Sequence, residues 1–131
     1  MAVFVDTGAW FAASVPSDPD HAAAVAFMRS NGERLVTSDY IYNELLTLFR
    51  SRGHLDRGKD WLTQVQQRRW EVVRVTRADI RLATDVFFSF ADKEWSFTDC
   101  TSRVLMERLG VQRAFAFDEH FRQFGTVVVV P

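Results

Sequence analysis

Residues 2–8 read AVFVDTG, a short apolar run that stops at an aspartate. The run from Ala2 to Val5 has the composition of a buried strand, and the DTG that follows has the composition of a turn. A second run of this kind, Ala114 to Phe117, is followed directly by Asp118. Short apolar strands separated by helices are typical of a mostly parallel sheet, so the sequence predicts the α/β fold class.

The rest of the chain supplies the helices and three further strands of this fold. Helix starts are indicated by residues that cap helix N-termini, namely Asp18 before Pro19, Ser38, Thr76 with Asp79, and Thr98. The expected strands are residues 2–5, 35–37, 71–75, 114–117 and 127–130, and the expected helices are residues 19–31, 38–52, 55–69, 76–90, 98–109 and 118–124. Since no linker or repeat divides them, we expect one domain over residues 1–131.

Composition excludes several classes of protein. Hydrophobic residues make up 47% of the 131 residues and charged residues 25%, which is typical of a packed core and not of disorder. Cys100 is the only cysteine, so a disulfide framework and a cysteine-based zinc site are excluded. The aliphatic run from Val127 to Val130 is far too short to span a bilayer, and no secretion signal opens the chain. We therefore expect a cytoplasmic protein with no membrane partner.

Three aspartates lie where parallel sheets bind ligands. Asp6 follows the first strand, Asp118 follows the fourth, and Asp99 lies in the first turn of a helix. Ligands of an open parallel sheet occupy the crevice beyond the carboxyl ends of the strands, so Asp6 and Asp118 are directed toward that crevice. Taken alone, each aspartate is better explained as a cap of the helix that follows it.

Glu44 is harder to explain as a structural residue. Ile41, Leu45 and Leu48 form the apolar stripe of its helix, and Glu44 lies at the edge of this buried face. A buried carboxylate needs a cation, hydrogen-bond donors or a proton. A salt bridge to a nearby arginine would satisfy Glu44, and so would a metal ion that it shares with the aspartates.

Together the four acids favour a nuclease site. Converging carboxylates repel one another unless divalent cations neutralise them, and oxygen ligands select hard ions such as Mg²⁺ or Mn²⁺. One or two such ions activate a water and stabilise the leaving oxygen in phosphodiester cleavage. Spacing and charge therefore predict a metal-dependent nuclease whose catalytic and metal-binding residues are Asp6, Glu44, Asp99 and Asp118.

Four segments that contain these acids resemble the PIN domain family, specifically VapC-type toxin ribonucleases of bacterial toxin–antitoxin pairs. The segments are VDTGAW (5–10), TSDYIYNELLTLFRSRG (37–53), WSFTDCTS (95–102) and FAFDEHF (115–121). They occur in the family's order and span nearly the whole chain. The resemblance implies a three-layer fold with a five-stranded parallel sheet and metal-dependent RNA cleavage. It also implies a homodimer and a cognate antitoxin, with which larger assemblies can form.

The resemblance also implies a role for each acid. Asp6 and Asp99 are expected to contact the metal directly. Asp118 is expected to bind a second ion or to hold a metal-bound water, and Glu44 to position or deprotonate water.

Three further residues are expected to lie on the substrate side. Thr7 and Thr98 are hydroxyl residues beside the first and third aspartates, and Thr98 could orient a ligand or a phosphate. Arg103 departs from the family, where an apolar residue is expected, and it could pair with a carboxylate or contact RNA.

Other functions are weaker explanations of the same residues. DTG also occurs in retroviral-type aspartic proteases, but those are all-β and this chain has helical periodicity. A phospho-receiver domain needs a lysine near the end of a late strand, and neither Lys59 nor Lys93 lies there. A catalytically inactive binding module with a structural acidic cluster stays open.

Residues outside the four acids are interpreted as structural or as contact residues. His120, two residues after Asp118, could approach the substrate, but a place on a helix surface or at a dimer contact is the expectation. Cys100 is expected to be a buried filler. The aromatic residues between 87 and 97 exceed what one helix face needs. Some of them are expected to pack the core and the others to form a dimer or antitoxin surface.

Overall fold

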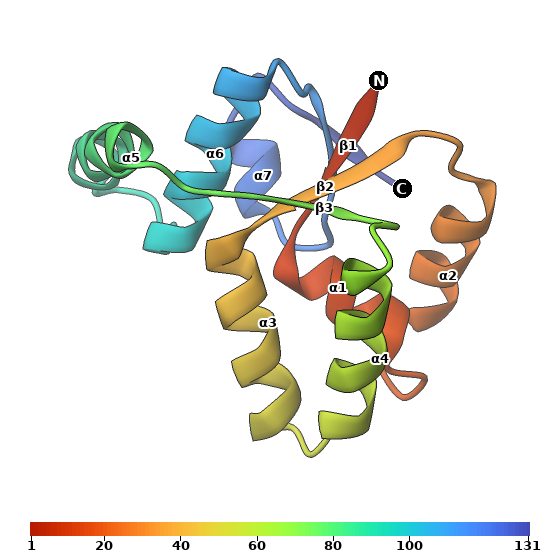
Figure 1. The fold of residues 1–131 in the computed structure, drawn as a ribbon. Coiled ribbons are helices and arrows are strands. Elements are labelled where there is room, and N and C mark those ends of the chain that lie inside the picture. Colours follow the sequence, from red (N-terminus) through yellow and green to blue (C-terminus); the bar gives the residue numbers. More distant parts are fainter.

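Five short parallel strands form one sheet in the computed structural model, which describes residues 1–131 (Figure 1). They are β1 (Ala2–Val5), β2 (Arg34–Ser38), β3 (Glu71–Val73), β4 (Arg113–Phe115) and β5 (Val128–Val130), in the order β3-β2-β1-β4-β5. Phe4 pairs with Val36 on one side and with Ala114 on the other. The predicted parallel α/β fold is therefore confirmed.

Seven helices connect the strands. They are α1 (Thr7–Ser14), α2 (His21–Ser30), α3 (Asp39–Ser51), α4 (Leu55–Gln66), α5 (Arg77–Ser89), α6 (Phe97–Leu109) and α7 (His120–Gln123). The chain steps from β1 to β2 and β3 in one direction, and then to β4 and β5 in the other. Right-handed crossovers therefore place α1 to α4 on one face and α5 to α7 on the other, as Figure 1 shows. None of the seven helices has the length and apolarity that crossing a bilayer requires.

Aromatic side chains join the helices of the first face to one another. The ring of Trp10 on α1 lies 4.5 Å from that of Trp70 and 5.6 Å from that of Trp61 on α4. Trp10 and Trp61 are almost completely buried. This packing fixes α1, and with it the turn that carries Asp6.

Two predicted helix starts agree with the structure in detail. Ser38 caps α3 by accepting a hydrogen bond from the Ile41 N–H at 3.1 Å. Thr76 and Asp79 form a capping box at the start of α5. In both cases a local side-chain acceptor satisfies backbone N–H groups that have no partner inside the helix.

Three other expectations were wrong. Residues 7–14 form α1 instead of a turn; five of its eight residues are buried, so it has no amphipathic stripe that would indicate a helix. Helix α2 begins at His21 because the Asp18 side chain accepts a hydrogen bond from the Asp20 N–H, which forms a turn. Helix α6 is capped by Ser96, not by Thr98.

An ion pair links α5 and α6. The Arg108 guanidinium donates to both Asp79 carboxylate oxygens at 2.9 Å and to the Arg74 carbonyl at 3.2 Å. Burial alone would raise the pKa of Asp79, but the hydrogen bonds from Arg108 and Thr76 outweigh it and lower that pKa. The Asp79 side chain is 2% exposed, so its charge depends on this partner.

We expect Arg108→Ala to destabilise the protein by about 2 kcal/mol, since 42% exposure of the arginine screens part of the interaction. Urea unfolding at pH 7 measures this, with the exposed Arg81→Ala as the control. Because the pKa of Asp79 is lowered in the folded state, its contribution is present above the ordinary pKa of an aspartate. The difference between the two proteins should therefore shrink as pH falls through the lowered pKa; a difference that is constant with pH would contradict this account.

Candidate active site

The chain brings Asp6 and Asp118 together through the two central strands of the sheet. Asp6 follows β1 directly, and Asp118 lies three residues after the end of β4, which pairs with β1. The Asp6 N–H donates to the Phe115 carbonyl at 3.0 Å, which continues the pairing of these strands. The connections from β1 and β4 run in opposite directions, so both aspartates follow the point of the sheet where parallel α/β folds bind ligands.

Asp6 is the buried centre of the site. Its side chain occupies the N-cap position of α1 but makes no capping hydrogen bond, and the residue is only 4% exposed. Burial raises its pKa well above the ordinary value, and the carboxylates of Asp118, Asp99 and Glu44 raise it further. The Thr7 N–H offsets only part of this shift. Asp6 therefore lies within electrostatic reach of all three other acids.

Asp99 is held at the start of α6 by one of its two oxygens. Its Oδ2 accepts hydrogen bonds from the Ser96 N–H at 3.0 Å and from Nδ1 of His120 at 2.7 Å. Its backbone N–H donates to the Ser96 hydroxyl, which completes a capping box. The expectation that Asp99 caps a helix is thus correct, yet its Oδ1 has no hydrogen-bond partner and stays available for a ligand.

Asp118 lies at the exposed rim of the site. Its Oδ1 accepts a hydrogen bond from the His120 N–H at 3.0 Å. One ligand atom each from Asp99, Asp118 and His120 lie within 4.8 Å of one another. Asp118 also lines a cavity of about 370 Å³ together with Gly8, Phe11 and Arg52. Of the four acids only Asp118 lines this cavity, whose other charged residues are Asp18, Asp20 and Arg52.

Glu44 reaches the site from α3. Ile41 and Leu45 on the same helix are fully buried, and Glu44 is half-buried beside them, as its place at the edge of the apolar stripe predicts. It forms no salt bridge with an arginine, so the competing structural explanation of Glu44 was wrong. Its charge acts on Asp6 instead.

The donor set of this site fits a divalent cation. Neither lysine nor arginine forms an ion pair with any of the four acids, although five other carboxylates of the chain have such a pair. A buried aspartate with three acidic neighbours is destabilised unless a cation or a proton neutralises it. Carboxylate oxygens are the ligands that Mg²⁺ and Mn²⁺ prefer. Asp6, Asp118 and the free Oδ1 of Asp99 provide them.

Comparison with known proteins gives the family. The sequence profile of the PIN domain matches residues 3–127, which include all four acids. The chain belongs to the PIN domain family. Divalent-metal-dependent RNA cleavage is the chemistry of nucleases in this family, and the acidic cluster of this PIN domain is consistent with it.

Curated relatives cover the PIN domain from end to end. VapC20 of Mycobacterium tuberculosis, named a 23S rRNA-specific endonuclease, is 32% identical in an alignment 133 positions long that covers 98% of each chain. Ribonuclease VapC26 of the same species is 28% identical in an alignment 135 positions long that covers 98% of this chain and all of VapC26. The chain is thus homologous to VapC ribonucleases.

Solved structures agree with this relationship. The crystal structure of VapC20, described as a sarcin–ricin loop cleaving toxin, superposes with a TM-score of 0.92 at 29% identity. The match covers 98% of this chain and 99% of VapC20. FitAcB from Neisseria gonorrhoeae superposes with a TM-score of 0.73 at 13% identity over 100% of this chain and 97% of FitAcB, which shows a shared fold.

The three residues expected on the substrate side differ in their surroundings. The Thr7 hydroxyl is buried next to Asp6 and has no hydrogen-bond partner. Thr98 is half-buried in the first turn of α6. The Arg103 guanidinium lies over the rings of Phe90 and Trp95, 4.9 and 5.7 Å from their centres. Arg103 forms no ion pair with a carboxylate of the chain, and its guanidinium lies against these two rings instead.

The bond between His120 and Asp99 is the feature of the site that sequence reasoning missed. His120 was expected mainly on a helix surface or at a dimer contact, whereas its ring is hydrogen-bonded to Asp99. Its separation of two residues from Asp118 was the only signal in the sequence. The phospho-receiver alternative is not favoured, since Lys59 lies within α4 and Lys93 between α5 and α6, away from any strand end.

Proposed function

We propose that this PIN domain is a metal-dependent endoribonuclease and the toxin of a toxin–antitoxin pair. The observation that carries the proposal is the convergence of four acids at the carboxyl edge of the sheet without a lysine or arginine partner. The homology to VapC ribonucleases supports the same function.

Each acid has a role in this proposal. Asp6, Asp118 and Oδ1 of Asp99 would hold one or two Mg²⁺ or Mn²⁺ ions. Such an ion, when bound, activates a water and offsets charge that develops on the phosphodiester. The Glu44 carboxylate orients that water and accepts its proton. Glu44 suits this task because it approaches from α3 and, unlike Asp99 and Asp118, its carboxylate accepts no hydrogen bond from the protein.

Thr7, Thr98 and Arg103 complete the proposed substrate side. The unpartnered Thr7 hydroxyl is a donor for a metal ligand or a phosphate oxygen. Thr98 precedes Asp99 in the first turn of α6 and is half-buried, so its hydroxyl could orient a ligand or a phosphate. Arg103 lies one turn after Asp99 on α6 with its guanidinium against two rings, and its N–H groups would be the donors to a phosphate.

We infer that the substrate is a structured loop of ribosomal RNA. VapC20 is named for cleavage of 23S rRNA and of the sarcin–ricin loop, and it matches this chain over nearly its full length. The test uses purified protein with 23S rRNA, transfer RNA and a sarcin–ricin stem-loop, in Mg²⁺, Mn²⁺ or EDTA. We expect one discrete cut in the stem-loop with metal and none with EDTA. Absence of cleavage of all three RNAs would overturn the proposal.

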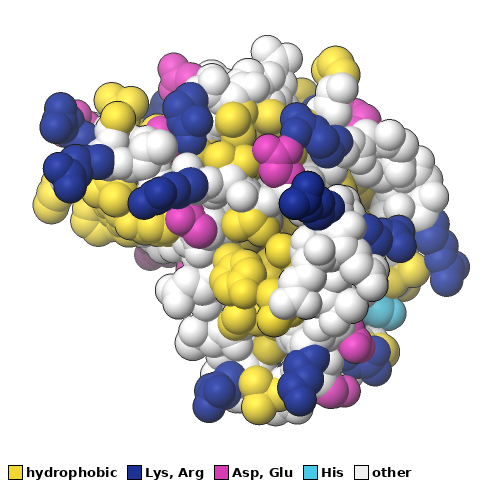
Figure 2. All heavy atoms as spheres, viewed as in Figure 1, with side chains coloured by type: hydrophobic (Ala, Val, Ile, Leu, Met, Phe, Trp, Pro, Cys, Tyr) yellow, Lys and Arg dark blue, Asp and Glu magenta, His cyan; other side chains and the backbone are white.

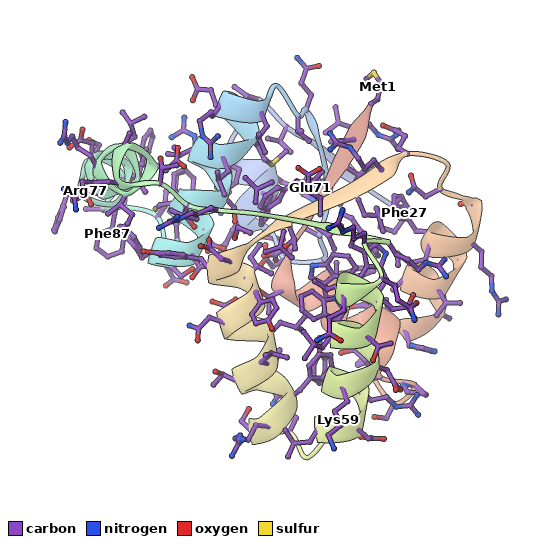
Figure 3. All side chains as sticks on the ribbon, in the orientation of Figure 1. Met1, Phe27, Lys59, Glu71, Arg77 and Phe87 are labelled. Carbon is purple, nitrogen blue, oxygen red and sulfur yellow. The ribbon has the colours of Figure 1, made fainter.

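The cognate antitoxin has a candidate docking surface between α3 and α4. Leu46, Leu55 and Leu62 line an apolar cavity of about 390 Å³ with Arg50 and Lys59 at its rim. Figure 2 shows hydrophobic side chains along this hairpin and basic ones at its tip, and Figure 3 shows Lys59 at the lower end of α4. An amphipathic segment with acidic residues fits such a surface. Co-expression with the antitoxin should therefore suppress toxicity.

A homodimer is proposed through α5. Leu82, Phe87 and Phe88 are 54%, 40% and 73% exposed on this helix, and Figure 2 shows the hydrophobic side chains gathered there. Phe87 and Phe88 pack edge to face, with their ring centres 5.3 Å apart. An exposed aromatic patch of this kind is typical of a protein interface.

We expect Phe88→Asp to convert the dimer to a monomer, because a buried unpaired charge opposes association by several kcal/mol. Light scattering after gel filtration measures the mass. Leu55→Asp, a similar change at an exposed leucine on α4, is the control and should stay dimeric. A Phe88→Asp protein that remains a dimer would place the interface elsewhere.

A further inference from the structure

His120 contacts the third and the fourth acid of the site through two different donors. Its ring Nδ1 lies 2.7 Å from Oδ2 of Asp99, and its backbone N–H donates to Oδ1 of Asp118 at 3.0 Å. The two aspartates belong to segments that are 19 residues apart, Asp99 on α6 and Asp118 after β4. His120 is thus the residue that ties these two segments together at the site.

These two hydrogen bonds leave one oxygen free on each aspartate. Oδ2 of Asp99 is already shared between the Ser96 N–H and His120, while its Oδ1 has no partner. Oδ1 of Asp118 is engaged by the His120 N–H, which leaves Oδ2. A carboxylate with one oxygen fixed by donors cannot rotate freely, so its other oxygen keeps one direction.

The His120 ring itself is placed to donate and not to bind an ion through Nδ1. An ionised carboxylate only accepts hydrogen bonds, so Nδ1, at 2.7 Å from Oδ2 of Asp99, is assigned the proton and then has no free lone pair. The opposite edge of the ring carries Nε2. His120 lines a cavity of about 510 Å³ whose six lining residues are all polar.

We propose that His120 is a positioning residue of the active site, which orients Asp99 through Nδ1 so that Oδ1 faces the metal. The inference rests on the proposed nuclease function. Donors that hold metal-ligating carboxylates raise metal affinity by a factor of about 10 to 100. The backbone bond to Asp118 survives any side-chain change, so substitutions at position 120 test the bond to Asp99 alone.

Three substitutions of His120 distinguish a role of Nδ1 from a role of Nε2. The amide nitrogen of His120→Asn lies near the place of Nδ1 and can donate to Asp99. The amide of His120→Gln lies near the place of Nε2, and His120→Ala has no donor. Each full-length variant is titrated with Mn²⁺ alone, by calorimetry and by loss of the free-ion paramagnetic resonance signal. RNA cleavage is then measured at saturating Mn²⁺ to separate kcat from KM.

We expect His120→Ala and His120→Gln to bind Mn²⁺ about 10- to 100-fold more weakly, and His120→Asn to stay within about threefold of the unmodified chain. KM for RNA should not change. His54→Asn, the same change at a histidine with no hydrogen bond to the acids, should leave Mn²⁺ affinity unchanged. Thermal unfolding in EDTA shows whether each variant is folded.

Three results would overturn the inference. They are unchanged Mn²⁺ affinity in His120→Ala, an equal loss in His120→Asn and His120→Ala, and a raised KM for RNA at unchanged Mn²⁺ affinity. The last two would mean that the ring itself binds the ion or contacts the substrate. Failure of the proposed function looks different, because the unmodified chain would then cleave no RNA whatever its Mn²⁺ affinity.

Discussion

The Asp6→Asn variant is expected to lose RNA cleavage by a factor on the order of 1,000 or more. Asp6 is the buried member of the acidic cluster, and the other three carboxylates all act on it. Asparagine keeps the size of the side chain but removes the negative charge that a divalent cation requires. Single-turnover cleavage of the stem-loop RNA at saturating Mg²⁺ or Mn²⁺ measures the loss.

Two controls make this result specific. Asp60→Asn changes an exposed aspartate on α4 and should cleave like the unmodified protein. Circular dichroism should show the same fold for both variants, because Asp6 makes no capping hydrogen bond that asparagine would lose. Cleavage by Asp6→Asn at the rate of the Asp60→Asn control would show that the acids do not form the catalytic site.

Asp6→Asn should also stabilise the metal-free protein, and the gain in stability should depend on pH. The pKa of Asp6 is raised in the folded state above its ordinary value of 3.8. Above pH 3.8 the folded protein therefore binds more protons than the unfolded chain does. Stability is therefore lost as pH rises from this value through the raised pKa. In EDTA at pH 8 we expect the melting temperature of Asp6→Asn to be a few °C higher than that of the unmodified protein, which corresponds to about 1 kcal/mol of unfolding free energy. Below pH 3.8 we expect no difference in melting temperature. Thermal unfolding at several pH values measures this. A lower melting temperature at pH 8 would contradict the account.

Divalent metal is expected to stabilise the unmodified protein strongly. Binding to the folded state alone adds about 2.7 kcal/mol when the free ion is 100 times its Kd, which raises Tm by roughly 10 °C for a chain of this size. The physical reason is that the ion removes the repulsion among Asp6, Asp99 and Asp118. Differential scanning calorimetry with Mn²⁺, with Mg²⁺ and with EDTA measures the shift.

The matched control for this effect is the Asp6→Asn protein. Its Tm should respond much less to Mn²⁺, while the Asp60→Asn protein should respond fully. Equal shifts in both variants would place the bound ion away from the four acids. Tm values that are identical in Mn²⁺ and EDTA would exclude a stabilising metal site.

Local sequence patterns predict much of this fold because local interactions decide it. The apolar run before Asp6 forms β1, and Ser38 and Thr76 cap helices with their own side chains. Helix α1 could not be recognised, since a helix buried on most sides has no polar face to set its period. The Ser96–Asp99 capping box was readable in principle, but Thr98 offers a competing hydroxyl two residues later.

The positions of the four acids could also be predicted from sequence patterns. The strand-end rule places Asp6 and Asp118 in one crevice, and helical periodicity places Glu44 at the edge of a buried face. The hydrogen bond between His120 and Asp99 was not predictable. It depends on how α7 packs against α6, which brings together residues 21 positions apart. The contact of Arg103 with Phe90 and Trp95 was not predictable either, because it also depends on tertiary packing.

Anomalous diffraction from crystals grown with Mn²⁺ tests the site most directly. The account predicts manganese peaks within bonding distance of the carboxylate oxygens of Asp6, Asp99 and Asp118, and no peak there in crystals of Asp6→Asn. Manganese bound only at other carboxylates, with these three side chains turned away from one another, would contradict it.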